Sequence, residues 1–212
     1  MDAFGKLWTF PMETMTHAGA DALQLLMTRQ SHWPLTEPAP DDAQLRQIFD
    51  AALRAPDHGG LRPWRFVLIR GDARLKLGEV LVDLASSRSP GEPRSAHEHR
   101  GGRALAAPVV IALVASITTR TKVPEVEQLL AVGAAAMNML NAVHALGFGG
   151  FWATGADSYE PGMHRALGLA DTDRLLGFLF VGTPPEGTRE IARPSSDAYV
   201  TEWFEASVQS TD

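Results

Sequence analysis

The stretch APVVIALVAS, residues 107–116, restricts the fold of this chain more than any other part of the sequence. Apolar and polar residues do not alternate along it, as they would in a strand with one solvated face, so it predicts a strand buried on both faces. The segment LLGFLFVGTPP, residues 175–185, predicts a second buried strand. Helices must then cover the sheet on both sides, and we expect an α+β fold with a small sheet between helices.

The longest predicted helix lies in PEVEQLLAVGAAAMNMLNAVHALGFGG, residues 124–150, and ends at Gly147. It is apolar nearly all round, so it is either central to the fold or part of a subunit interface. An amphipathic helix is predicted over 41–55, because the residue before Pro56 tends to leave the helical region. The other predicted elements are helices over 21–31, with Asp21 as N-cap, and 72–86, and strands over 64–70 and 149–155.

The tail SDAYVTEWFEASVQSTD follows the last predicted strand. It carries three aromatic residues, Tyr199, Trp203 and Phe204. A tail of this composition is not simply solvated, and we expect it to pack onto another surface.

Length and composition exclude several classes of protein. A chain of 212 residues suits one domain, and we predict an N-terminal extension over 1–20 and a single domain over 21–212. The net charge of −6, without a basic stripe, argues against a nucleic-acid partner. The absence of cysteine excludes disulfides, thiolate catalysis and cysteine-ligated metals. No apolar run of membrane-spanning length and no signal-peptide core are recognised, so a cytoplasmic protein without a membrane partner is expected.

Several motifs have simple structural explanations. Residues 147–150, GFGG, follow a helix, whereas a dinucleotide fingerprint follows a strand, so a helix end and tight turn are favoured. His97 and His99 lie in the polar segment 87–103, which we expect to be mobile and exposed, so surface histidines are favoured over metal ligands. No metal site is predicted. No Gly-x-Ser-x-Gly motif is present, but a Ser/His/Asp triad built from distant residues stays an open alternative.

Two cationic stretches are candidates for a binding site. Arg29 and Ser31 flank Gln30 where the first helix ends, and a guanidinium with a hydroxyl can hold one phosphate, although a solvated helix cap is the simpler alternative. The stretch RAPDHGGLRPW, residues 54–64, joins a helix to a strand with more polar residues than a connection needs. Its two glycines permit close approach and unusual dihedral angles. Trp64 is expected to anchor the core where the strand begins.

Four segments in this order resemble the nitroreductase family of flavin enzymes: DALQLLMTRQSHWPLTEPAP, AALRAPDHGGLRPWRFVLIRG, KVPEVEQLLAVGAAAMNMLNAVHALGFGGFWATG and LLGFLFVGTP. The resemblance covers roughly residues 21–200 and is strongest to the small bacterial NAD(P)H nitroreductases with an APDH turn. It implies a mostly antiparallel sheet flanked by helices. It also implies an intertwined homodimer with two FMN sites at the subunit interface, in which the C-terminal arm of each chain reaches over its partner.

The resemblance also implies which residues bind the cofactor. Arg29, Gln30 and Ser31 match the motif that holds the phosphate and ribityl groups of FMN. Arg54 and His58 match flavin-contacting positions, and Trp152, Ala153 and Thr154 match a second segment on the phosphate side. Two positions depart from the pattern: the relatives carry an arginine where this chain has Ala153, and many members carry glutamine where it has Arg62. These departures predict weaker phosphate binding and a guanidinium near the pyrimidine edge of the flavin.

The implied reaction is ping-pong hydride transfer from NADH or NADPH to FMN and then to a nitroaromatic, quinone or similar small-molecule acceptor. Since the flavin performs the chemistry, no catalytic acid or base is named. Two alternatives stay open at this point. One is an activated-alkene reductase on the same fold, and the other is a flavin-binding or degenerate dimer without nicotinamide-dependent turnover.

Overall fold

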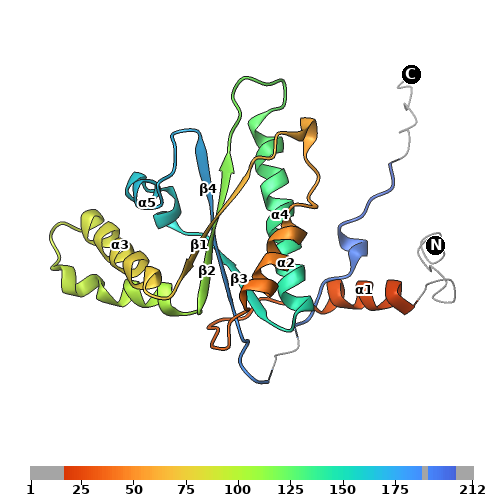
Figure 1. The fold of residues 1–212 in the computed structure, drawn as a ribbon, viewed down its shortest axis with the longest axis horizontal. Helices are drawn as coiled ribbons and strands as arrows, with labels where there is room; N and C mark the ends of the chain where they lie inside the picture. Colours follow the sequence, from red (N-terminus) through yellow and green to blue (C-terminus); the bar gives the residue numbers. More distant parts are fainter. Residues whose placement is uncertain (1–16, 188–190, 204–212) are drawn as a thin grey trace, which may run out of the picture.

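The computed structural model describes residues 17–187 and 191–203. Its centre is a four-stranded antiparallel sheet in the order β1-β2-β4-β3. The predicted α+β fold with an antiparallel sheet between helices is confirmed (Figure 1). The strands are β1 (Trp64–Arg70), β2 (Val109–Ser116), β3 (Gly149–Ala153) and β4 (Asp173–Gly182).

Helices cover both faces of this sheet, as the buried strand predicts (Figure 1). One face carries α2 (Asp42–Ala52) and α4 (Glu125–Ala145), and the other carries α3 (Ala73–Arg88) and α5 (Pro161–Ala166). From Val110 to Ala115, β2 is fully buried. The other helical elements of the described residues are α1 (His17–Thr28) and the 3₁₀ segments η2 (His58–Gly60), η3 (Arg94–Leu105), η4 (Ala156–Tyr159) and η5 (Ser196–Ala198).

A capping box begins α2. The side chain of Asp41 accepts a hydrogen bond from the Gln44 backbone at 2.8 Å, and the Gln44 side chain accepts one from the Asp41 backbone at 2.9 Å. Buried Leu45, Ile48 and Ala52 then hold α2 against the core. This anchoring fixes the point from which the chain enters the turn over residues 54–64.

Two sequence expectations are wrong in detail. The first helix begins at His17 and not at Asp21, because alanines at 18 and 20 are strong helix formers that extend it. Most of the segment 87–103 is exposed, as predicted, but the part of it that forms η3 packs closely on α3. A Cβ added to Gly78 would lie 3.0 Å from the carbonyl oxygen of Gly101, so the two backbones touch. His97, expected at the surface, is buried.

Among the described residues, α4 is a helix that by length and composition could cross a membrane. The expectation that no stretch has this length is therefore wrong. Eight side chains of α4 are nevertheless buried in the fold, and the core helix of a soluble protein passes the same test. These are Gln128, Ala131, Val132, Ala135, Ala136, Met139, Leu140 and Val143.

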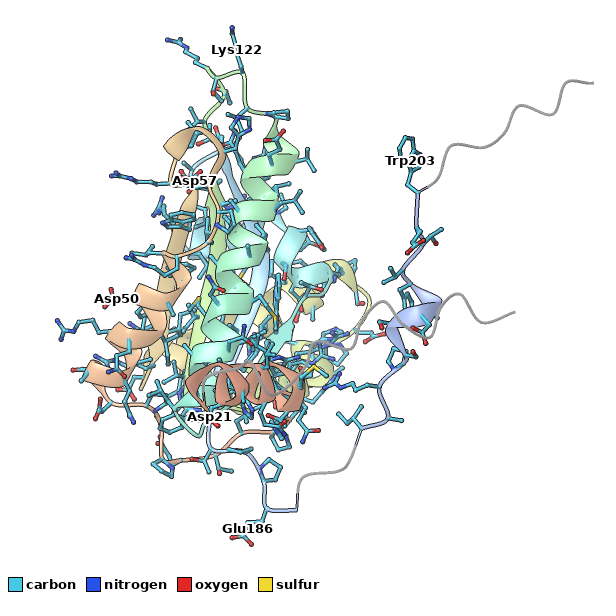
Figure 2. All side chains as sticks on the ribbon, turned by 90° about the vertical axis from the view of Figure 1, so that its right-hand side faces the viewer. Asp21, Asp50, Asp57, Lys122, Glu186 and Trp203 are labelled. Carbon is cyan, nitrogen blue, oxygen red and sulfur yellow. The ribbon has the colours of Figure 1, made fainter. Side chains whose placement is uncertain are left out.

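The chain after β4 leaves the body of the protein as an arm, residues 191–203 (Figures 1 and 2). Tyr199 is 75% exposed and Trp203 is 93% exposed. Phe204, also expected to pack, lies outside the described residues. The described residues thus leave Tyr199 and Trp203 largely unpacked, and burial of the tail against a second chain stays a prediction.

Candidate functional site

The predicted phosphate-binding segment lies directly beside β3. Ser31 forms a parallel bridge with Gly150, and the backbone nitrogen of His32 donates to the carbonyl oxygen of Gly150 at 3.3 Å. Gly150 has to lack a side chain, because a Cβ there would lie 2.8 Å from Cδ2 of Leu140 on α4. The GFGG motif therefore ends α4 and lets β3 and the segment from Arg29 to Ser31 lie close beneath it.

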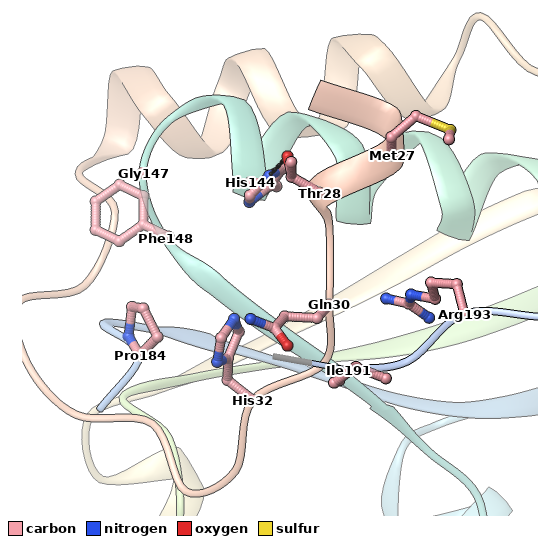
Figure 3. A pocket seen from close by; sticks show the side chains of 10 residues that line it. All are labelled: Met27, Thr28, Gln30, His32, His144, Gly147, Phe148, Pro184, Ile191 and Arg193. Atoms are coloured by element: carbon pink, nitrogen blue, oxygen red, sulfur yellow. Dashed lines mark hydrogen bonds between the residues drawn. The ribbon is translucent and has the colours of Figure 1, made fainter. Parts of the chain in front are cut away.

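A pocket of about 670 Å³ opens where α1 ends, α4 ends and the C-terminal arm passes (Figure 3). Nitrogen-bearing side chains from all three segments line it, and among the described residues no aspartate or glutamate does. The lining residues are Met27, Thr28, Gln30, His32, His144, Gly147, Phe148, Pro184, Ile191 and Arg193.

Arg29, between two lining residues, carries a positive charge for which the described residues supply no ion pair. Its Nη1 is buried and has no hydrogen-bond partner within the described chain. Arg193 lies beside it and donates from Nη2 to the carbonyl oxygen of Arg29 at 2.8 Å. Burial, and next the charge of Arg193, lower the pKa of Arg29. Two neighbouring guanidiniums with a buried free donor form a site suited to an anion.

Two histidines extend this positive environment. Burial is the largest cause that lowers the pKa of His32, followed by the charges of His144 and Arg29. His144, in the last turn of α4, lies with its Nε2 3.0 Å from the hydroxyl oxygen of Thr28 (Figure 3). An anion in this pocket would lower the cost of protonating His32, because it would offset the neighbouring positive charges.

The turn over residues 54–64 is tightly held in an unusual backbone conformation. Gly59, Gly60 and Arg62 all have positive φ, at 76°, 63° and 52°. The carboxylate of Asp57 closes the turn by accepting from the Arg62 backbone at 2.7 Å. A non-glycine residue at positive φ before a proline is strained, and such strain is often found at functional sites.

This turn rests on the beginning of α4. Nδ1 of His58 contacts Oε2 of Glu127 in the first turn of α4. Gly59 lies so close to Val123 that an added Cβ would be 3.2 Å from its Cγ2. The side chains of Arg54 and Arg62 are exposed.

The structure therefore places two of the three predicted groups of site residues at opposite ends of α4. Arg29, Gln30 and Ser31 lie near His144 in the last turn, whereas His58 lies on Glu127 in the first. At a rise of 1.5 Å per residue, these two turns are about 25 Å apart. A single chain does not bring the two groups together.

The third predicted segment lies along β3 and contributes to the core. Trp152 packs on the α4 side of the sheet and donates from Nε1 to the carbonyl oxygen of Leu176 at 2.9 Å. Ala153 packs on the opposite, α3 side. Thr154 is exposed. The side chain of Ala153 thus points away from the face that carries α4.

Sequence reasoning missed Arg193, His32 and His144 as residues of the pocket. His144 lies in a helix that the sequence marks as apolar nearly all round, and Arg193 lies outside every motif identified there. Their role follows from contacts with residues 116 and 164 positions away, between Thr28 and His144 and between Arg29 and Arg193. The position of His32 next to the segment 29–31 was the one local signal available.

Comparison with known proteins settles the family. The model of the nitroreductase family matches residues 26–183. The chain belongs to the nitroreductase family. This member is 38% identical over 182 residues to “Putative NAD(P)H nitroreductase YdjA” of Escherichia coli strain K12, covering 85% of this chain and 98% of that protein.

Solved structures show the same fold. The nitroreductase-like family protein from Bacillus cereus superposes with a TM-score of 0.73 at 22% identity, over 86% of this chain and 95% of that one. A Desulfovibrio desulfuricans protein, described as a putative nitroreductase in complex with FMN, superposes with a TM-score of 0.66 at 27% identity. That match covers 87% of this chain and 98% of the other.

Proposed function

We propose that this nitroreductase family member is an FMN-dependent NAD(P)H oxidoreductase that holds the FMN phosphate in the pocket at the end of α4. The observation that carries the proposal is the buried Nη1 of Arg29, which has no hydrogen-bond partner among the described residues and lies beside a second guanidinium, that of Arg193. The names of relatives support the same reading, since one is called an NAD(P)H nitroreductase and another was solved with FMN.

The donors around the pocket fit a phosphate group. A phosphate monoester carries about −1.5 to −2 charges near neutral pH. Arg29 and Arg193 would supply charge-assisted hydrogen bonds, and Ser31 and Gln30 would supply neutral donors. His32 would add a donor, and a positive charge when protonated. The arginine missing at position 153 is then not required, because Arg193 provides a second guanidinium from the arm.

A second copy of the chain would complete the site. In a two-fold dimer whose α4 helices run antiparallel, each end of α4 meets the opposite end of its partner. The partner's His58 and the partner's Arg62 would then lie beside Arg29. Neither group of predicted residues forms a complete flavin site alone.

Exposed apolar side chains on the α4 side support this dimer. Val126, Leu130 and Met137 are 58%, 66% and 40% exposed, and they share one stripe of α4 with Gly133, whose missing side chain leaves open space. On α1, Met27 is 76% exposed. The family resemblance to homodimers and the unpacked aromatic arm point the same way.

When bound, FMN would supply the hydride-transfer chemistry, and the residues of this chain would bind and orient it. Arg29 and Arg193 would fix the phosphate end, and the partner's turn would face the ring. The turn from Asp57 to Arg62, closed by the Asp57 carboxylate, would need little further ordering on binding. Nitroaromatics and quinones are the proposed acceptor classes.

The test uses purified protein in the absence of oxygen. We expect it to be yellow, or to take up added FMN, and to lose its flavin absorbance when NADPH or NADH is added. Reoxidation by a nitroaromatic or a quinone should restore the colour. Protein that binds FMN but is not reduced by either nicotinamide would instead be a flavin-binding protein, and protein that binds no FMN would refute the proposal.

A further inference from the structure

We propose that Glu127 is a positioning residue that fixes the imidazole of His58, so that Nε2 is the ring nitrogen presented to a ligand. This inference rests on the proposed function, because it makes His58 a contact to the flavin. It adds a residue from α4 to which neither the sequence motif nor the family resemblance gives a role.

The contact itself assigns the two ring nitrogens. Nδ1 of His58 lies against Oε2 of Glu127, and an ionised carboxylate is an acceptor only. Nδ1 must therefore carry a proton, whether the ring is neutral or charged. Nε2 is left as the nitrogen that can vary: it accepts a hydrogen bond in the neutral ring and donates one in the imidazolium.

The surrounding turn restrains the backbone of His58, and Glu127 restrains its ring. Gly59 abuts Val123, and the Asp57 carboxylate closes the turn onto the Arg62 backbone at 2.7 Å. Yet the His58 side chain is 67% exposed, so most of the ring is open to a ligand. A fixed backbone, a fixed ring rotation and an open nitrogen together are what a preorganised binding group requires.

The chain offers a matched control for the charge of Glu127. Glu125 lies in the same first turn of α4, and its side chain is 46% exposed against 40% for Glu127. Glu125 pairs with Arg174 at 3.0 Å and not with His58. Alanine at either position removes one negative charge from the same helix end. Both variants therefore lose the same favourable interaction with the helix dipole, and only Glu127→Ala also loses the contact to His58.

The first measurement is the tautomer of His58, from ¹⁵N NMR of the apoprotein at alkaline pH. His58→Gln assigns the signal among the seven histidines. In the unsubstituted protein and in Glu125→Ala we expect the form protonated on Nδ1. In Glu127→Ala the ratio of this form to the other should fall about fivefold, which corresponds to about 1 kcal/mol for an exposed pair. An unchanged ratio would overturn the inference.

The second measurement is FMN affinity in a double-mutant cycle. Glu127→Ala and His58→Ala should each weaken binding about two- to tenfold, and Glu125→Ala should leave it unchanged. If Glu127 acts through His58, the double variant binds FMN no worse than His58→Ala alone. Additive losses would show that Glu127 acts by another route and would refute the positioning role.

The two proposals fail in different ways. If Glu127→Ala and His58→Ala keep full affinity while Arg29→Ala loses it, the phosphate site stands and the positioning role is wrong. If Arg29→Ala also keeps full affinity, the proposed phosphate site is wrong as well. Circular dichroism of each variant checks that the fold is intact.

Discussion

Replacing Arg29 with methionine should change apoprotein stability and FMN affinity in opposite directions. In the apoprotein, Arg29 has a buried Nη1 for which the described residues supply no hydrogen-bond partner, and it lies beside the charge of Arg193. Methionine keeps much of the apolar stem, and it removes both the unsatisfied donor and the repulsion between the two guanidiniums. A buried unsatisfied polar group costs about 1–3 kcal/mol of stability. Because this guanidinium is not fully buried, we expect Arg29→Met to raise the free energy of unfolding of the apoprotein by about 1 kcal/mol.

The same substitution should weaken FMN binding strongly. A hydrogen bond to a charged group contributes about 1.5–3 kcal/mol, and each 1.4 kcal/mol is about tenfold in affinity. Arg29→Met should therefore raise the dissociation constant for FMN by about 10- to 150-fold. In the absence of FMN the variant should be more stable than the unsubstituted protein. On addition of FMN it should gain less stability than the unsubstituted protein does.

Urea denaturation of apoprotein and flavin-fluorescence titration measure the two effects. Arg103→Met is the matched control, because Arg103 is exposed on η3, on the other side of the sheet from α4. The control should change neither quantity appreciably. If Arg29→Met destabilises the apoprotein and leaves FMN affinity intact, Arg29 is a structural residue and the assignment of the anion site is wrong.

Three further predictions concern the fold, the assembly and the pH dependence. Gly177→Ala should lower the free energy of unfolding by at least about 3 kcal/mol, because φ is 112° and a Cβ would lie 2.4 Å from a backbone oxygen. Gly60→Ala, also at positive φ but in open space, should lower it by about 1–2 kcal/mol, and thermal melts of both variants check this. Leu130→Glu should give a monomer that retains its fold but loses FMN, seen by light scattering and absorbance, and an FMN-loaded monomer would refute the shared site. His32 has a lowered pKa in the fold, so the unfolded chain binds more protons, and stability falls as the pH drops below about 6.5; His32→Gln should flatten this slope in urea melts between about pH 7 and pH 5.

The sequence predicts the parts of the fold that local periodicity determines. The unbroken apolar run ending at Ser116 identified the central strand, because a strand covered on both faces needs no polar positions. The long alanine-rich helix followed from its composition. The burial of His97 was not predicted, because the segment around it is charged and mostly exposed, and the close approach of Gly101 to Gly78 of α3 has no local signal.

The candidate site was predictable only in fragments. The motif from Arg29 to Ser31 predicted residues near the last turn of α4, and the turn at His58 predicted residues near its first turn. Nothing local shows that α4 keeps them about 25 Å apart within one chain, or that Arg193 joins Arg29. Such contacts depend on how distant elements pack, which periodicity does not encode.

The exposed arm has a consequence for how long an unassembled chain would last in a cell. Extended segments with little burial are the preferred sites of proteolytic cleavage. If the proposed dimer forms, a subunit that has not yet paired would present residues 191–203, with Trp203 93% exposed, to any protease nearby. A subunit whose arm lies against its partner would not. Dimer formation would then protect the chain from proteolysis. Unpaired chains would be cleaved first in the arm, the segment that also supplies Arg193.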